Sequence, residues 1–456
     1  MVTIPLQYES LKAVLPYLDA NIRFQISLCI PYISSLEKRI PLKIENLTFS
    51  KNGTTVNEFR YQVGIYRDFG SKEALYYFVP KNDSGGEPSD IDQYGFPIYP
   101  GYDTLFPGDI DLSGEFFDMD LDYSEEKEHK LIQKLRIYKI LLAEFQVPAG
   151  EDDICIESVP WDASLESNIR DYAECFEPDC EYIRSEFKSE VQTIRETLAP
   201  YIYRRNNTKP PYTPLIQFTT RSPKGSTTIQ RFAYNKHLFE ALKVLNNKFF
   251  EKRSSVISVK HLNIEFNEDI IRFPTGCMLR IDGLKGEIRN AFQFESSFPL
   301  NKLEIFGLHV DSADFSHQIV REAKTLVISA FTLEGDLWSP FLRDLPNRRV
   351  ILKNSMVWES RENYLNLIDD WLERGREVGT FFSMCIRNED IAEQCLDTLK
   401  QREEVIKFSE KQVQFKIGAA LILNVYYEFT GKPAIIYNDY DSKWVLHLKV
   451  SHARSD

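Results

Sequence analysis

The chain has 456 residues, of which 43% are hydrophobic and 27% are charged, a composition typical of a globular protein with about two to four domains. Lys and Arg number 55 against 68 Asp and Glu, which gives a formal net charge of −13. Binding to nucleic acid or to an anionic membrane draws affinity from neutralised phosphates, so an acidic chain without a basic tract argues against both partners.

The first forty residues predict short helices. Leu11, Val14, Leu15 and Leu18 recur at i, i+3, i+4 and i+7, which places them on one face of a helix. A second helical pattern runs from 22 to 30 and ends before a proline. Residues 1–40 are therefore expected to form a helical segment.

Residues 41–112 have a β-rich pattern. Apolar and polar residues alternate at 41–49 and again at 61–66, and Asn52-Gly53 lies between the two stretches. Alternation around an Asn-Gly pair predicts a β-hairpin, and glycine and proline after residue 84 predict a loop-rich continuation.

Residues 113–214 combine an acidic stretch, helices and a linker. The acidic stretch at 115–128 predicts a solvated loop, and its alternating carboxylates lack the Gly and Glu positions of an EF-hand calcium loop. Helices are expected at 125–145 and 181–198. Three prolines at 206–214 favour a linker there.

Residues 215–456 contain a periodic pattern. Strand-like triplets begin at Leu262, Leu279, Leu303, Leu326 and Val350, and the last three intervals are 24, 23 and 24 residues. These intervals lie within the range of leucine-rich repeats, although ordinary βα units remain an alternative. A helix at 362–374, a strand at 380–386, a helix at 388–399 and several strands after 413 are expected to follow.

Together these patterns predict an α+β protein. It would comprise a helical segment at 1–40, a β-rich segment at 41–112, an acidic loop with helices and a linker at 113–214, and an irregular leucine-rich-repeat-like half with a β-rich end at 215–456.

The sequence contains no recognisable catalytic or metal-binding motif. It has no P-loop, no G-x-G-x-x-G and no G-x-S-x-G. Cys175 and Cys180 form C-x₄-C, but no His follows within forty residues, and the seven histidines show no H-x-x-x-H spacing. We therefore predict a protein without catalytic residues, cofactor or metal.

The sequence also bears on the cellular compartment. Seven cysteines are few and odd in number, which favours free thiols in a reducing environment. No signal peptide is recognised at residues 1–12, and the apolar stretch 418–425 is too short to cross a bilayer. These observations predict a cytoplasmic or nuclear protein.

Residues distributed over most of the chain carry a resemblance to a known family. They are Pro5-Leu6, Tyr8, Ser10-Leu11, Val14-Leu15, Tyr17-Leu18, Arg23, Pro31, Ile33, Glu37-Lys38, Pro41-Leu42, Thr55-Val56-Asn57, Tyr61, Gly64-Ile65-Tyr66, Asp92-Gln93-Tyr94-Gly95-Phe96, Pro100-Gly101, Pro107-Gly108-Asp109, Glu240-Ala241-Leu242-Lys243, Val259-Lys260, Trp371-Leu372 and Val378-Gly379-Thr380. In these residues the chain resembles the nematode F-box C family.

The resemblance implies a function that the residues alone do not give. An F-box docks an adaptor subunit of a cullin-type ubiquitin ligase, and the remainder of such a chain captures an unknown target protein. The implied docking or core residues are Pro5, Leu6, Leu11, Val14, Leu15 and Leu18. The segment departs from a standard F-box in reading Pro5-Leu6 in place of Leu-Pro, and in lacking the Trp common in the last helix.

Two other readings stay open at this point. The chain could be an interaction or scaffold module of the same family with no ligase role, in which case the apolar residues at 1–40 pack on the β-rich segment. An unrecognised enzyme would instead bring titratable groups together in a pocket.

Overall fold

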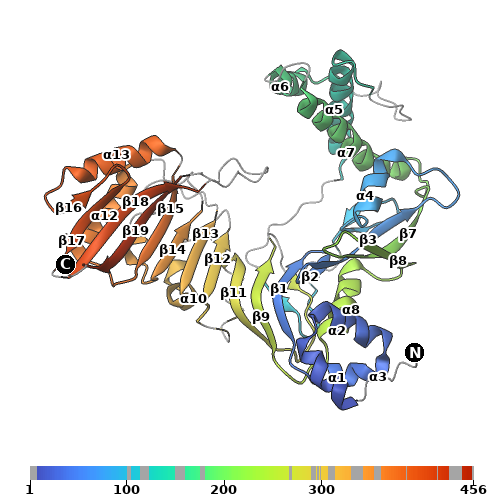
Figure 1. The fold of residues 1–456 in the computed structure, drawn as a ribbon. Helices are drawn as coiled ribbons and strands as arrows, with labels where there is room; N and C mark the ends of the chain where they lie inside the picture. The colour runs from blue at the N-terminus through green and yellow to red at the C-terminus, as the bar shows by residue number, and fades with distance from the viewer. Residues whose placement is uncertain are drawn as a thin grey trace. The chain divides into compact units, whose positions relative to one another are not determined.

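The computed structural model describes residues 8–99, 104–112, 123–148, 160–174, 180–265, 270–288, 294, 297, 299–306, 314–329, 342–353, 361–386, 388–418, 420–430 and 444–453 (Figure 1). Helices make up 40% and strands 31%, so the predicted α+β class is confirmed. The predicted residues Pro5, Leu6 and Cys175, and the acidic stretch as far as residue 122, lie outside the described residues.

The chain divides into two compact units. Unit 1 comprises Met1–Phe59, Phe106–Gly114 and Asn246–Asp456, and unit 2 comprises Arg60–Leu105 and Glu115–Leu245. Each unit therefore combines residues from several of the four segments expected from the sequence.

Unit 1 begins with short helices, here called the N-terminal helices: α1 (Tyr8–Val14), the 3₁₀ helix η1 (Leu15–Tyr17), α2 (Ala20–Cys29) and α3 (Pro31–Glu37). Asp19 caps α2 by accepting a hydrogen bond from the backbone N–H of Asn21 at 2.8 Å. Pro31 stands at the first position of α3, where a missing N–H costs nothing. Leu15, Leu36 and Ile40 form a small core between the helices.

The remainder of unit 1 is built on one sheet, in the order β16-β17-β18-β19-β15-β14-β13-β12-β11-β9-β1-β2. Its strands are β1 (Lys43–Ser50), β2 (Gly53–Val56), β9 (Ile257–Ile264), β11 (Leu279–Glu287), β12 (Lys302–Phe306), β13 (Thr325–Ser329), β14 (Arg349–Leu352), β15 (Phe381–Ile386), β16 (Val405–Phe408), β17 (Gln412–Ile417), β18 (Leu421–Phe429) and β19 (Trp444–His452). The strands from β1 through β15 in this order are parallel, and β15 then continues into an antiparallel meander.

The strands that the periodic pattern predicts between residues 262 and 352 are present, in register. One row of laterally paired and buried side chains crosses the sheet: Leu47, Leu262, Leu284, Leu303, Leu326, Val350, Phe382 and Leu448. Because strand side chains alternate between faces, a period set by such a row keeps one face apolar throughout. The classification of these units as leucine-rich repeats stays a prediction.

Helices α10 (Gln318–Glu322), α12 (Arg361–Arg374) and α13 (Glu389–Lys400) accompany the parallel strands. The Trp371 ring of α12 meets Phe382 of the apolar row edge-on at 4.8 Å between centroids. Helix α13 begins at an Asn388 cap, buries Leu396 and Leu399, and contacts β15 through β18. The predicted helices at 362–374 and 388–399 are thereby confirmed within one residue at each end.

The hairpin predicted around Asn52-Gly53 exists, but its second strand is β2 and not the strand at 61–66. Asn57 follows β2 in the left-handed conformation, with φ at 54°. Its side-chain oxygen accepts the backbone N–H groups of Glu45 and Asn46, so the chain turns again after only four residues of strand.

Unit 2 contains a three-stranded antiparallel sheet of β3 (Phe59–Asp68), β7 (Thr213–Arg221) and β8 (Thr227–Ala233). Its helices are η2 (Tyr76–Phe78), α4 (Val79–Ser84), α5 (Glu125–Glu144), α6 (Ala163–Glu174) and α7 (Glu181–Arg205), joined by the first residues of α8 (Leu238–Phe250). Helices α5, α6 and α7 pack around a core of their own (Figure 1).

Both long helices predicted in this region are present. Helix α7 runs seven residues beyond the predicted end at 198, through Pro200. A proline inside a helix costs about 3 kcal/mol, and here Ala199, Pro200 and Tyr201 are all buried. Packing therefore overrides the local signal to stop.

Candidate functional site

The N-terminal helices carry the residues that the resemblance singles out, and they are firmly attached to unit 1. The Asp19 carboxylate, which caps α2, also accepts a hydrogen bond from Asn57 Nδ2 at 2.5 Å. Asn21 Nδ2 donates to the carbonyl of Val56 at 3.1 Å. Phe24 stacks on Phe249 with 4.7 Å between ring centroids. The helices are thus part of the core of unit 1.

A buried ion cluster completes this attachment. Glu37 accepts hydrogen bonds from Arg23 Nε at 2.9 Å and from Arg253 Nη2 at 2.9 and 3.0 Å. The three side chains are 0–2% exposed. Arg23 also donates to the carbonyls of Pro41 and Ile40. The Glu37 carboxylate therefore joins α2, α3 and the segment after α8, and Arg23 adds the residues just before β1.

Burial acts on both cations of this cluster. Desolvation lowers the pKa of Arg23 and of Arg253, and the neighbouring Glu37 carboxylate opposes that shift. Arg253 Nη1 has no hydrogen-bond partner among the described residues. Two cations against one anion leave this interior site with one unbalanced positive charge.

Several large apolar side chains of the N-terminal helices are exposed. Tyr17 and Tyr32 are 88% and 82% exposed, and Val14, Ile22 and Leu28 are also exposed large hydrophobic residues. Exposed apolar side chains mark interaction sites where they form a contiguous patch.

Helix α2 illustrates the pattern best. Its only charged residue, Arg23, is buried, whereas its exposed positions are Ile22, Gln25, Leu28 and Cys29. An ordinary surface helix has the reverse arrangement, with its charges outside and its apolar stripe inside. The exposed positions of α2 therefore carry no charged side chain. We refer to Tyr17, Ile22, Leu28 and Tyr32 as the apolar surface.

The structure separates the residues predicted for partner binding. Leu15 is fully buried in the small core, and Leu11 and Leu18 are partly buried against it. Val14 alone of the four described residues is clearly exposed. The predicted single helix is broken, because α1 ends at Val14 and η1 begins at Leu15. Leu11, Leu15 and Leu18 nevertheless meet in the small core, whereas Val14 does not share their face. The apolar surface was missed, although the lack of exposed charge in α2 was a usable signal.

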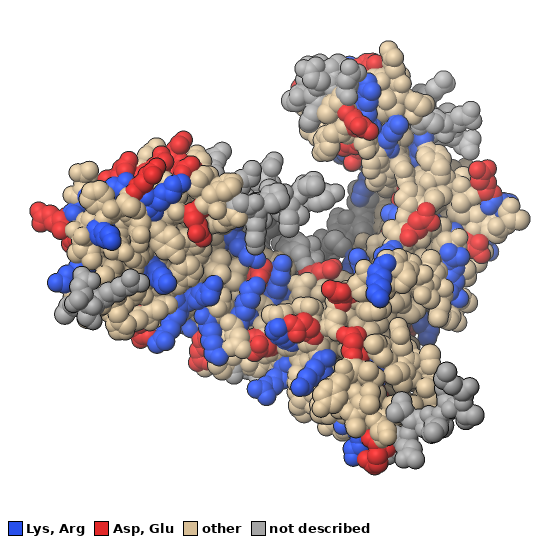
Figure 2. Space-filling model, viewed as in Figure 1, with Lys and Arg blue, Asp and Glu red and all other residues tan. Residues whose placement is uncertain are grey.

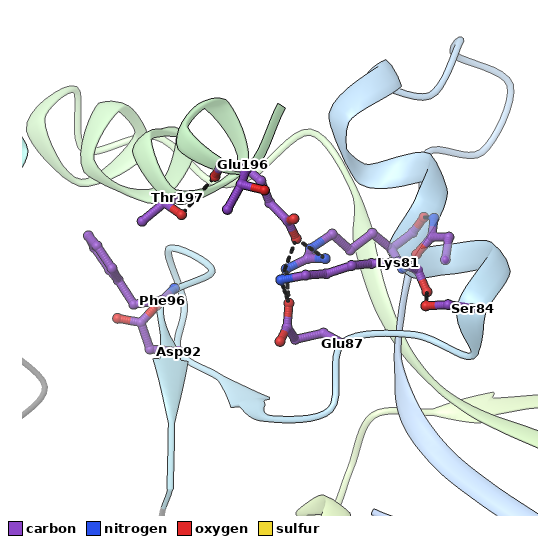
Figure 3. A network of polar contacts seen from close by, with 10 residues as sticks. Lys81, Ser84, Glu87, Asp92, Phe96, Glu196 and Thr197 are labelled. Atoms are coloured by element: carbon purple, nitrogen blue, oxygen red, sulfur yellow. Dashed lines mark hydrogen bonds and ion pairs between the residues drawn. The ribbon is translucent and has the colours of Figure 1, made fainter. Parts of the chain in front are cut away.

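A second polar constellation lies in unit 2, on α4, α7 and β3 (Figure 3). Glu87 Oε2 binds Lys81 Nζ at 2.7 Å and Arg67 Nη2 at 3.2 Å. Glu196 Oε1 binds the same two cations at 2.9 and 3.2 Å. In Figure 3, the labelled Lys81, Glu87 and Glu196 side chains converge on one point.

The electrostatics of this quartet are typical of a structural network. Burial raises the pKa of Glu196, and the adjacent Lys81 and Arg67 oppose the shift. The two carboxylates in turn raise the pKa of Lys81 against its own desolvation. Arg67 also lies 4.3 Å over the Phe78 ring. Two cations alternate with two anions, so every charge has two opposite neighbours.

Among the described residues, no three His, Cys, Asp or Glu side chains come together in a way that could hold a metal ion. Within the same residues, no helix has both the length and the apolar character that crossing a bilayer requires.

Comparison with known proteins yields one match. A family model described as a domain of unknown function, DUF3557, matches residues 237–388, about a third of the chain. The match begins at α8, covers the parallel strands β9 to β15, and leaves the N-terminal helices outside. No curated protein and no solved structure matches the chain.

Proposed function

We propose that this chain is a non-catalytic interaction protein that links a target protein to a cullin-type ubiquitin ligase. In this proposal the N-terminal helices bind the adaptor subunit of the ligase, and the parallel-sheet half of unit 1 captures the target. The observation that carries it is the apolar surface, whose large side chains face solvent on helices without exposed charge.

The burial pattern changes which residues we expect to contact the adaptor subunit. Leu15 lies inside, so its substitution would disturb folding before it disturbed docking. Tyr17, Ile22, Leu28 and Tyr32 are available to a partner instead. Tyrosine is one of the residues enriched among the hot spots that supply most of the binding energy at protein interfaces, and the contacts around a hot spot exclude water from it. The resemblance supplies the identity of the partner.

Co-purification of the full chain with the F-box-binding adaptor subunit tests the proposal. We expect the wild type to bind and Ile22→Asp/Leu28→Asp to bind at least about tenfold more weakly, because each change places a charge in an apolar contact. The matched control is Ile229→Asp/Phe232→Asp on β8, which changes two side chains of similar exposure in unit 2. Circular dichroism and thermal unfolding establish that both variants fold.

The alternative is an interaction or scaffold module without a ligase role. The packing of Leu15, Leu36 and Ile40 favours it, since helices with a core of their own do not require a partner for stability. If the folded wild type fails to bind the adaptor subunit, this alternative replaces the ligase role.

A further inference from the structure

The open face of the sheet in unit 1 carries a cluster of lysines around one carboxylate. Glu304, on β12, lies 2.8 Å from Lys302 Nζ and 2.6 Å from Lys353 Nζ, and Lys285 Nζ is 3.6 Å away. We call Lys285, Lys302 and Lys353 the lysine triad. Lys353 follows β14, so its side chain reaches across the intervening β13 to contact Glu304.

The triad is exposed although its anion is not. The three lysine side chains are 44–50% exposed, whereas the Glu304 side chain is 6% exposed. The carboxylate therefore lies beneath the ammonium groups, on the side of the strands opposite Leu303 and Ile305 of the apolar interior. Each ammonium has three donors, so donors remain for a ligand at the surface.

The lysines hold Glu304 in its charged form. Burial alone would raise the pKa of Glu304, but hydrogen bonds from Lys302 and Lys353 outweigh burial and lower it to about 2. At neutral pH the cluster thus contains three cations and one anion. A single buried carboxylate orients the lysines without neutralising them.

The surroundings strengthen this local positive charge. Strands β11 to β14 with Lys353 contain five basic residues, Arg280, Lys285, Lys302, Arg349 and Lys353, against three acidic residues, Asp282, Glu287 and Glu304. The whole chain, by contrast, has a net charge of −13. Figure 2 shows Lys and Arg side chains gathered over these strands. Arg349 lies 5.6 Å from the Phe381 ring, which extends the basic region toward an aromatic side chain.

We propose that this face binds an acidic segment of the target protein, with the lysine triad contacting its carboxylates. The proposal rests on the proposed function, in which this half of the chain captures the target. Charge complementarity identifies the occupant: the ammonium groups of Lys285 and Lys353 both lie against Glu304 Oε1, at 3.6 and 2.6 Å, so they are close enough together to contact neighbouring carboxylates of one short acidic peptide. A nucleic acid would require a longer track of cations than this compact group provides.

Fluorescence anisotropy with a labelled deca-glutamate peptide and the full chain tests the proposal. We expect the wild type to bind deca-glutamate, more weakly at higher salt, and to ignore deca-glutamine. Lys285→Gln/Lys302→Gln/Lys353→Gln should weaken binding at least about tenfold, because it removes three charge-assisted contacts. The control Lys224→Gln/Lys236→Gln/Lys248→Gln removes the same charge at three exposed positions and should change affinity less than about twofold.

Three results would overturn the proposal. They are absent binding of deca-glutamate by the folded wild type, equal weakening in the two triple variants, and tighter triad-dependent binding of a ten-nucleotide oligothymidylate. Should the triad variant unfold, Lys353→Gln is compared with Lys353→Arg, which keeps the charge. Affinity must fall in the first and recover in the second.

The outcome is separable from that of the adaptor experiment. The triad lies on the sheet and the apolar surface lies on the N-terminal helices, so each set of variants should leave the other binding unchanged. If the wild type binds the peptide but does not bind the adaptor subunit, only the ligase role is rejected.

Discussion

The two buried ion clusters differ in how their buried cations are balanced by anions. In unit 1, Arg23 and Arg253 share the single carboxylate of Glu37, and all three side chains are sealed from solvent. In unit 2, Arg67 and Lys81 alternate with two carboxylates, and the Lys81 side chain is 42% exposed. The cluster in unit 1 has one anion, so both arginines lose their partner with it. In the cluster in unit 2, each cation has a second carboxylate.

This difference should determine how much stability is lost when one anion is removed. Removing one member of a buried pair leaves an uncompensated charge in a poorly polarisable interior, which costs more than the pair contributed. A cluster with two anions retains a partner for each cation, and an exposed ammonium can recover water. Redundancy and access to solvent should therefore set the cost, more than the number of ion pairs.

The largest effect should come from Glu37→Gln. The amide keeps the shape of the side chain but leaves two arginines buried without an anion, so we expect a loss of about 4 kcal/mol in the free energy of unfolding. Urea unfolding measures this loss, and amide hydrogen exchange over α2 and α3 localises it. Glu9→Gln, at an exposed position of α1, is the control. A loss below about 1 kcal/mol for Glu37→Gln would contradict the claim that a single, solvent-inaccessible anion is the costlier one to remove.

A smaller effect is expected from Glu196→Gln in unit 2. Glu87 still pairs with Arg67 and Lys81, so the loss should be about 2 kcal/mol, half that of Glu37→Gln. The double variant Glu87→Gln/Glu196→Gln should cost more than the sum of the two single variants, because only then does Arg67 lose both anions. Urea unfolding of the four proteins gives the coupling, and strict additivity would contradict the idea of a spare anion.

Neither cluster could have been predicted from the sequence, whereas many elements could. Helix α5 combines a capping serine with an apolar period, α12 has an acidic residue in its first turn and a basic residue in its last, and the parallel strands repeat at nearly even intervals, so local patterns are sufficient. Glu37 and Arg253 are 216 residues apart, and no local pattern relates them. Pairing across such separations is decided by tertiary packing.

In the candidate site, too, some features follow from local sequence patterns and others only from tertiary packing. The period that groups Leu11, Leu15 and Leu18 is visible in the sequence, but which side of the helices faces the core depends on Phe249 and Arg253, far along the chain. For this reason the sequence suggests Leu15 as a docking residue and does not indicate that Tyr17 and Tyr32 are exposed. The lysine triad was missed for a related reason, since its members come from three separate segments that meet only in the sheet.

The smallest effect, and the sharpest test, should come from Glu304→Gln. Glu304 is shared by three cations, more than Glu37 is, but those cations are about half exposed. If access to solvent sets the cost, the loss at pH 7 should be only about 1 kcal/mol, because the lysines regain hydration. This is less than the lowered pKa of Glu304 taken alone would give, since solvent screens half-exposed lysines from the carboxylate. A loss as large as that of Glu37→Gln would show instead that the number of cations per anion decides the cost.

The pH dependence gives this last test an independent readout. The pKa of Glu304 is about 2 in the folded chain against an ordinary value of 4.5, so its ionised form stabilises the fold above about pH 4.5. That contribution is lost as the pH falls from 4.5 toward 2, and Glu304→Gln has none to lose. The difference in unfolding free energy between the wild type and this variant should therefore shrink over that range, as urea unfolding at pH 6, 4.5 and 3.5 can measure. A difference that stayed constant with pH would mean that the lysines do not hold the carboxylate in its charged form, and the triad would then lose the anion that orients it.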